Sequence, residues 1–198
     1  MYLSCECMHV ARMVIHTQAQ QNSARAYASA VSLAASGDAE AFSRLILEHE
    51  GMLYRVCRTI LRNEADCADA VQETVIMAWR NLGQLKNAVS FPAWVARICI
   101  NQCYRQLRRS KRTEAETMFS SHEPGHDARL DVSGAIAALP EDMRLVVVFY
   151  YFEDWKVEQI AKATGLLRGT VKSRLYRARQ LLAEQLRNYK EGSRDDAR

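Results

Sequence analysis

A chain of 198 residues is long enough for one ordinary domain or two small ones, and 48% hydrophobic with 25% charged residues argues against wholesale disorder. No hydrophobic run reaches the roughly 18–20 residues that span a bilayer. Arg12 interrupts the N-terminal stretch where a signal peptide would lie. We therefore expect a cytoplasmic protein without membrane insertion. The net charge of +4 is modest, so the distribution of charge along the chain is more informative than its sum.

The N-terminal residues 1–37 contain few acids and many Ala, Ser and Gln residues, which predicts a flexible arm with some helix around residues 24–35. Cys5, Cys7 and His9 have the spacing of half a metal site, but no second pair of ligands is evident. We therefore predict no metal and no cofactor. Asp38 is a good helix N-cap, and ordered structure is expected to begin there.

Residues 38–112 are predicted to form a first helical domain. Apolar residues recur at helical spacing as far as Leu61, which gives one or two helices. Asp66 can cap the next helix, a polar loop follows at 83–90, and Pro92 is acceptable in the first turn of a third helix. In a reducing compartment the helical cysteines are expected to be small buried hydrophobic residues: Cys57, Cys99 and Cys103.

Residues 113–131 have no apolar period and are predicted to be a flexible linker. A second helical domain is expected over residues 132–189, followed by a disordered tail at 190–198. The run from Leu145 to Phe152 has the composition of a buried strand, but its acidic start and the absence of a partner strand favour a helix. The predicted fold is all-α, with two small helical domains joined by a flexible linker.

The second domain has the spacing of a helix-turn-helix. Ala161, Gly165 and Val171 supply a small residue, a turn glycine four positions later and an apolar residue six positions after that. Beyond the turn, an apolar row is expected to face the core: Val171, Leu175, Ala178 and Leu182. The outward row, at the positively polarised start of the helix, holds residues that bind phosphates or read bases: Thr170, Lys172, Ser173, Tyr176 and Arg177.

Charge is segregated along the chain. The stretches Arg97–Arg112 and Arg168–Arg179 hold six and five Lys or Arg residues with no acid, whereas Glu64–Glu73 holds four acids and no base. An ordinary solvated helix face would explain any one of these runs. Together they indicate two basic surfaces for DNA phosphates and one acidic surface for a different partner.

Two sets of motifs resemble a known family. The second half contains Leu139-Pro-Glu-Asp-Met-Arg144, Glu158-Gln-Ile-Ala161, Gly169-Thr-Val-Lys-Ser-Arg174 and Arg177-Ala-Arg179. The first half contains Asp69-Ala-Val-Gln-Glu-Thr74, Ala78-Trp79, Phe91, Trp94, Arg97-Ile98 and Arg108-Arg109. These motifs resemble regions 4 and 2, respectively, of bacterial RNA polymerase sigma factors of the extracytoplasmic-function (ECF), sigma-70-like type. Three places depart from the usual pattern: Val75, Arg105 and Leu167-Arg168.

The resemblance implies a non-enzymatic subunit that binds core RNA polymerase, at the clamp of its largest subunit and at its flap, and selects promoter DNA. It implies that region 2 docks on the clamp through Asp66, Asp69, Gln72 and Glu73. It implies contacts with the −10 element through Asn101, Arg105, Arg108 and Arg109, with one base of the opened strand entering a pocket formed by the loop at 83–90. Region 4 would read the −35 element through Arg168, Gly169, Thr170, Lys172, Ser173, Arg174, Tyr176 and Arg177. An anti-sigma factor commonly controls such a subunit.

Three other classes of protein fit less well. An activator of the response-regulator type would need an alternating α/β domain in residues 38–110. A nucleic-acid enzyme would need paired catalytic carboxylates, a metal box or a phosphate loop. The acids at 66, 69 and 73 could in principle chelate Mg²⁺, but no basic residue or histidine lies nearby to support such a site. An anti-sigma protein would not carry two basic runs. Trp79 and Trp94 could stack on bases, but their helical spacing favours the core.

Overall fold

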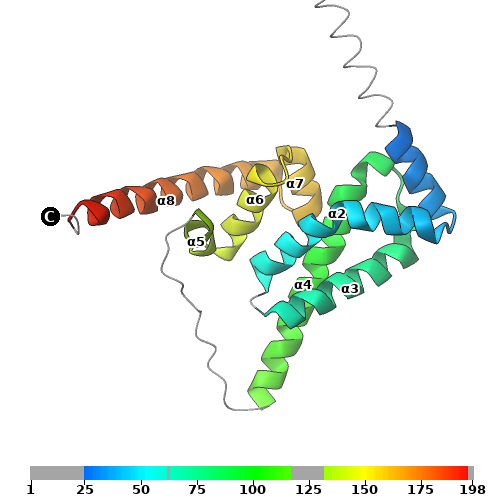
Figure 1. Ribbon diagram of the computed structural model, residues 1–198, viewed down its shortest axis with the longest axis horizontal. Coiled ribbons are helices and arrows are strands. Elements are labelled where there is room, and N and C mark those ends of the chain that lie inside the picture. Colours follow the sequence, from blue (N-terminus) through cyan, green and yellow to red (C-terminus); the bar gives the residue numbers. More distant parts are fainter. Residues whose placement is uncertain (1–24, 62, 117–131, 196–198) are drawn as a thin grey trace, which may run out of the picture.

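The computed structural model describes residues 25–61, 63–116 and 132–195, and every regular element within these ranges is helical (Figure 1). The all-α prediction is confirmed. The first half contains α2 (Ala39–Ile60), α3 (Glu64–Asn81) and α4 (Phe91–Glu116). The second half contains α5 (Val132–Ala137), α6 (Glu141–Tyr151), α7 (Val157–Thr164) and α8 (Arg168–Asp195).

The helix predicted around residues 24–35 is confirmed, but the prediction that ordered structure begins at Asp38 is wrong. Residues 25–35 form a helix, and Val31 and Ala34 on this helix are buried in the core. Gly37 follows with φ of 103°, a backbone conformation that terminates helices. Asp38 then caps α2, as predicted, by accepting a hydrogen bond from a backbone amide of the first turn at 2.9 Å.

Helix α3 begins at Glu64 because Asn63, and not Asp66, supplies its cap. The Asn63 side chain accepts a hydrogen bond from a backbone amide of the first turn at 2.9 Å. Asp66 lies inside the first turn and accepts a hydrogen bond from Gln106 of α4 at 3.1 Å. Tyr54 of α2 donates to the Glu64 carboxylate at 2.7 Å. The start of α3 is therefore bonded to both of its neighbouring helices.

The connection between α3 and α4 is more regular than the predicted polar loop. It contains two short 3-10 turns, η1 (Leu82–Gln84) and η2 (Ala88–Ser90). Pro92 lies in the first turn of α4, as predicted, where its missing N–H leaves no helical hydrogen bond unmade. The inward row of α4 is buried: Val95, Ala96, Cys99 and Cys103.

Two predicted boundaries are wrong. Helix α4 continues to Glu116, into the predicted linker, and α8 continues to Asp195, into the tail that was predicted to be disordered. Neither continuation contains a proline, and the single Gly192 costs only about 1 kcal/mol relative to alanine, so nothing in the sequence stops these helices. The remaining parts of the arm (with Cys5, Cys7 and His9), the linker and the tail lie outside the described residues: 1–24, 117–131 and 196–198.

Helix α6 occupies the run whose composition also suited a strand, so the helical alternative is confirmed. Its central residues are consecutively buried: Leu145, Val146, Val147, Val148 and Phe149. The Phe149 ring stacks on Trp155, with ring centroids 4.5 Å apart and an angle of 10° between the planes. The aromatic pair and α6 thus form the centre of the second half, against which α7 and the first turns of α8 pack.

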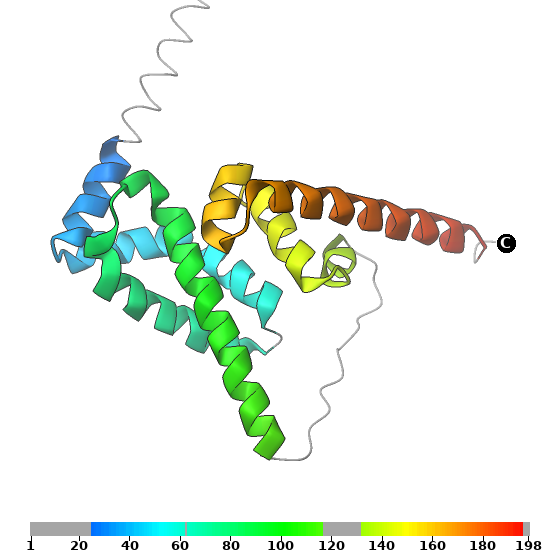
Figure 2. The same cartoon turned by 180° about the vertical axis from the view of Figure 1, so that it is seen from behind.

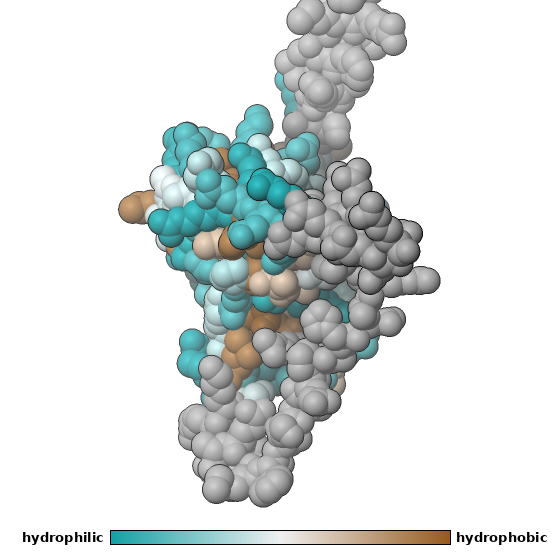
Figure 3. All heavy atoms as spheres, turned by 90° about the vertical axis from the view of Figure 1, so that its left-hand side faces the viewer, coloured by the Kyte–Doolittle hydropathy of each residue, from teal (hydrophilic) through white to brown (hydrophobic). Residues whose placement is uncertain are grey.

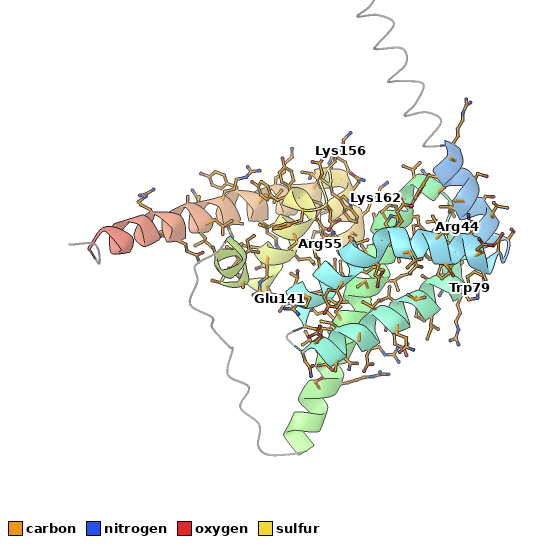
Figure 4. All side chains as sticks on the ribbon, viewed as in Figure 1. Arg44, Arg55, Trp79, Glu141, Lys156 and Lys162 are labelled. Carbon is orange, nitrogen blue, oxygen red and sulfur yellow. The ribbon has the colours of Figure 1, made fainter. Side chains whose placement is uncertain are left out.

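The two halves pack directly against each other. Helix α7 lies beside the N-terminal part of α4, and α6 lies beside α2 (Figure 2). Arg55 pairs with Glu153 at 2.6 Å, and Arg97 donates to the carbonyl oxygen of Lys162 at 3.4 Å. Figure 4 shows Arg55 and Lys162 at this junction. The sequence indicated two domains and a linker, but it contained no signal for this contact.

Candidate nucleic-acid interface

Helices α7 and α8 form the predicted helix-turn-helix. Gly165 ends α7 in the left-handed conformation, with φ of 74°, and its amide donates to the Ala161 carbonyl oxygen at 2.9 Å. On α8, Val171, Leu175 and Ala178 are almost completely buried, so the predicted inward row is confirmed. The opposite side of α8 is thereby left for solvent or a ligand.

We expect Gly165→Ala to destabilise the chain by about 1 kcal/mol, because a side chain at positive φ is strained even where space exists. Gly169→Ala is the matched control, since a Cβ there meets nothing within 4 Å and α8 continues through it. That control is expected to raise stability by about 0.5 kcal/mol. Urea unfolding followed by circular dichroism measures both, and equal effects of the two changes would contradict the expectation.

The predicted −35 residues of α8 divide into side chains exposed to solvent and side chains held by ion pairs. Lys172, Ser173, Tyr176 and Arg177 are exposed, Tyr176 by 61% of its surface, while Thr170 is half-buried. Arg168 and Arg174 are held by acids of neighbouring helices: Arg168 pairs with Glu158 of α7, and Arg174 pairs with Asp142 of α6 at 3.2 Å. Leu167, at the start of the helix, is 79% exposed and apolar, which sequence reasoning noted only as an unusual residue.

A second basic row lies on α4, on the side away from its buried cysteines. Asn101, Arg105, Arg108 and Arg109 are all exposed and share one face, since they are separated by four, seven and eight positions. Tyr104 beside them packs toward the second half, where burial and the neighbouring Glu141 carboxylate raise its pKa to about 12. The structure thus brings the four predicted −10 residues together on one surface.

The acidic surface of α3 retains three of its four predicted residues. Asp69, Gln72 and Glu73 are exposed on one face, at positions i, i+3 and i+4. Asp66 is half-buried and bonded to Gln106, so its carboxylate contributes to helix packing. Ile76 continues the exposed face with 38% of its surface accessible. Sequence reasoning missed Ile76, although its position seven residues after Asp69 places it on the same face.

The two tryptophans differ in burial. Trp94 is half-buried beside Phe91, with ring centroids 5.9 Å apart. Trp79 packs on Phe42, with ring centroids 4.9 Å apart, but keeps 39% of its surface exposed, at the far end of α3 from the junction (Figure 4).

Viewed from the end of α8, the described surface is mainly hydrophilic, with limited hydrophobic patches (Figure 3). No helix among the described residues has the length and hydrophobicity required to cross a membrane.

Comparison with known proteins assigns both halves. The family model "Sigma-70 region 2" matches residues 45–113, and "Sigma-70, region 4" matches residues 129–182. The ECF RNA polymerase sigma factor SigM of Mycobacterium tuberculosis is 32% identical over 82% of this chain and 85% of its own length. The chain belongs to the ECF group of sigma-70-like factors. RNA polymerase sigma factor SigV of Bacillus subtilis is 30% identical over 71% of this chain and 88% of its own length.

The fold of this sigma factor is similar to that of solved sigma factors. The structure of CnrH in complex with the cytosolic domain of CnrY aligns with a TM-score of 0.63 and 27% identity, over 82% of this chain and 98% of that chain. RpoE of Bartonella quintana, in complex with the anti-sigma factor NepR, aligns with a TM-score of 0.62 and 25% identity, over 74% and 96%. As an ECF sigma factor the chain binds core RNA polymerase and directs promoter-specific initiation, and it is not an enzyme.

Proposed function

We propose that this sigma factor directs RNA polymerase to two-part promoters, with α8 of region 4 in the major groove of the −35 element and α4 of region 2 on the −10 element. The observation that carries the proposal is a pair of exposed basic rows on two different helices, each with a buried apolar row on its other side. One DNA-reading helix can select one short site, whereas two such faces on one chain can select two sites along the same promoter.

Within region 4, we assign base reading to the exposed residues of the first turns of α8, with Arg177 as the principal one. Arg168 and Arg174 are assigned to orientation and phosphate binding, because Glu158 and Asp142 already hold their guanidinium groups. Gly169, Thr170, Lys172, Ser173 and Tyr176 complete the surface. Leu167, which is exposed, and Arg168 stand at the start of α8 and depart from the usual family pattern. We expect these two residues to make the promoter preference of this chain differ from that of its relatives.

Within region 2, Asn101, Arg105, Arg108 and Arg109 are assigned to the −10 strand. The turn between α3 and α4 lies at the N-terminal end of the same helix, and its Val89 is 68% exposed. We assign this turn to the pocket that receives a base from the opened strand. Extruding one base costs a few kcal/mol, which contacts from the basic row of α4 would offset.

The exposed acids of α3, Asp69 and Glu73 with Gln72 between them, are assigned to the polymerase clamp. Opposite-charge matching would speed the encounter and fix its register. Region 4 is assigned to the flap. Solved relatives occur in complexes with anti-sigma partners or, for CnrH, with the cytosolic domain of CnrY, and we propose such an inhibitor here. It would act in the cytoplasm by stabilising the close packing of regions 2 and 4, with the Arg55–Glu153 pair intact.

Reconstitution tests the proposal directly. The purified full chain is combined with core RNA polymerase, and the 5′ ends of transcripts made on genomic DNA are sequenced. We expect new start sites that share a −35 and a −10 sequence and that disappear when the sigma factor is left out. Binding to core polymerase without any new start site would overturn promoter selection, and absence of binding would overturn the assignment of the acidic face as well.

Reversing one charge of the acidic face is expected to weaken polymerase binding. Glu73→Lys places a cation where a basic partner surface is expected, and a roughly tenfold rise in Kd corresponds to about 1.4 kcal/mol. Glu50→Lys on α2 is the matched control, because Glu50 is also exposed, lies outside the surfaces assigned to the polymerase, and its substitution changes the net charge equally. Fluorescence anisotropy with core polymerase measures both variants. A similar loss in the control would mean that net charge, and not the α3 face, sets the affinity.

A further inference from the structure

Three cysteine side chains of region 2 meet in the core between α2 and α4. The sulfur atoms of Cys57 and Cys99 are 3.3 Å apart, those of Cys57 and Cys103 are 3.5 Å apart, and all three lie within 4.8 Å of one another. All three residues have 0% of their surface exposed. The prediction that they are small buried side chains is confirmed, but hydrophobic packing alone does not require three sulfur atoms to converge.

The two helices fix the geometry of this thiol triad. Cys99 and Cys103 are four residues apart, so they lie one turn apart on the same face of α4, and Cys57 faces them from α2. Metal–sulfur bonds of about 2.3 Å place three sulfur atoms roughly 4 Å apart around a trigonal ion. The sulfur–sulfur distances from Cys57 to Cys99 and to Cys103 are shorter than this by roughly half an ångström, and small side-chain rotations can lengthen them by that amount.

The three thiols of the triad influence one another's pKa through their hydrogen bonds and burial. The Cys103 thiol donates to the Cys57 sulfur, and hydrogen bonding within the triad lowers the pKa of Cys103 below its usual range. Hydrogen bonding within the triad, together with burial, raises the pKa of Cys57 and that of Cys99. A thiolate is the form of cysteine that binds metals, so binding of a cation would be coupled to loss of thiol protons.

We propose that the thiol triad of Cys57, Cys99 and Cys103 binds one Cu(I) ion in a trigonal, all-sulfur site. Soft sulfur ligands favour soft ions such as Cu(I). Zn²⁺ takes four ligands in structural sites, whereas among the described residues only these three sulfur atoms lie within 4.8 Å of one another, with the buried Cys67 outside the group. Because each cysteine that binds as a thiolate gives up its proton, the affinity for Cu(I) is expected to rise with pH.

The test is an anaerobic titration with Cu(I) of the full chain that carries the substitutions Cys5→Ser and Cys7→Ser. These substitutions remove the two thiols that lie outside the described residues. Cu(I) is supplied from a chromogenic chelator that competes for it, and proton release is followed in weak buffer. We expect one Cu(I) per chain, with release of protons on binding. We also expect a higher Tm, because the ion bridges α2 and α4 and binds only the folded chain.

Single substitutions localise the site. Cys57→Ala, Cys99→Ala and Cys103→Ala are each expected to weaken Cu(I) binding by roughly tenfold or more. Cys67→Ala is the matched control, because Cys67 is a buried cysteine of α3 outside the triad, and it is expected to retain the parental affinity. Circular dichroism establishes which variants are folded. Folded triad variants that bind Cu(I) as tightly as the parent would overturn the proposal.

X-ray absorption at the copper edge keeps the proposal testable even where an alanine variant fails to fold, since it uses the chain with the triad intact. Three sulfur ligands and no nitrogen or oxygen ligand are expected. Absence of stoichiometric binding, a coordination shell of other composition, or displacement of the copper by equimolar Zn²⁺ would each overturn the assignment of Cu(I) to this site.

Discussion

Phe149→Ala is expected to lower the free energy of unfolding by about 3–5 kcal/mol, the largest loss that we expect from a single change in region 4. Phe149 has 0% of its surface exposed and stacks on Trp155, so truncation removes both buried apolar area and an aromatic contact. The cavity would lie under α7 and α8, and promoter binding through region 4 should be lost together with stability. Urea unfolding at 25 °C, followed by circular dichroism, measures the loss.

The chain offers a control of the same chemistry three residues later. Phe152 is 54% exposed, and Phe152→Ala is expected to change stability by less than about 0.5 kcal/mol, as surface substitutions usually do. A comparable loss in both variants would show that the aromatic pair is not the centre of this core. A loss below about 1 kcal/mol for Phe149→Ala would show that the site collapses around the smaller side chain.

Arg177→Ala is expected to weaken binding to the preferred −35 sequence by about 1–3 kcal/mol and to relax the preference at one or two base pairs. Arg177 is exposed on the outward row of α8, and no ion pair holds it among the described residues, in contrast to Arg174 with its Asp142 partner. Its guanidinium can therefore reach a guanine edge. The measurement is the affinity of polymerase holoenzyme for a panel of duplexes that differ in the −35 element.

Arg187→Ala is the matched control for this experiment. Arg187 is exposed on the same helix, ten residues and thus about 15 Å further along, beyond the reach of the first turns. Its loss should leave the order of preferred sequences unchanged. If Arg177→Ala weakens binding equally to every duplex in the panel, Arg177 binds a phosphate and another residue of α8 reads the base.

The helix-turn-helix could be predicted from the sequence because its determinants are local. A positive-φ position at Gly165 and an apolar row through Val171 and Leu175 lie within one short window, and each is encoded by residue type and spacing. The helix at 25–35 carried the same kind of signal, with Tyr27, Ala30, Val31 and Ala34 at helical spacing. The helix itself was predicted, but its packing against the core was not, because alanines contribute little to an apolar pattern although they pack closely.

Other features depend on residues far apart in the sequence. The acidic run predicted four equivalent residues, yet Asp66 differs from its neighbours because Gln106, forty positions away, bonds to it. The contact between Arg55 and Glu153 is separated by 98 positions and joins two regions that each fold around their own helices. The convergence of Cys57 with Cys99 is of the same kind. No local pattern encodes such pairs, so they require the folded structure.

The bond between Asp66 and Gln106 has a consequence for initiation. It fastens α3, which we propose faces the polymerase, to α4, which we propose faces the DNA, and the two helices pack through buried rows on their inner sides. With the proposed roles of the two helices, we expect region 2 to act as a preorganised adaptor, in which contact with the enzyme on one side orients the arginines on the other at little additional entropic cost. The distance from the polymerase to the first melted base pair would then be a built-in dimension of region 2, the same at every promoter.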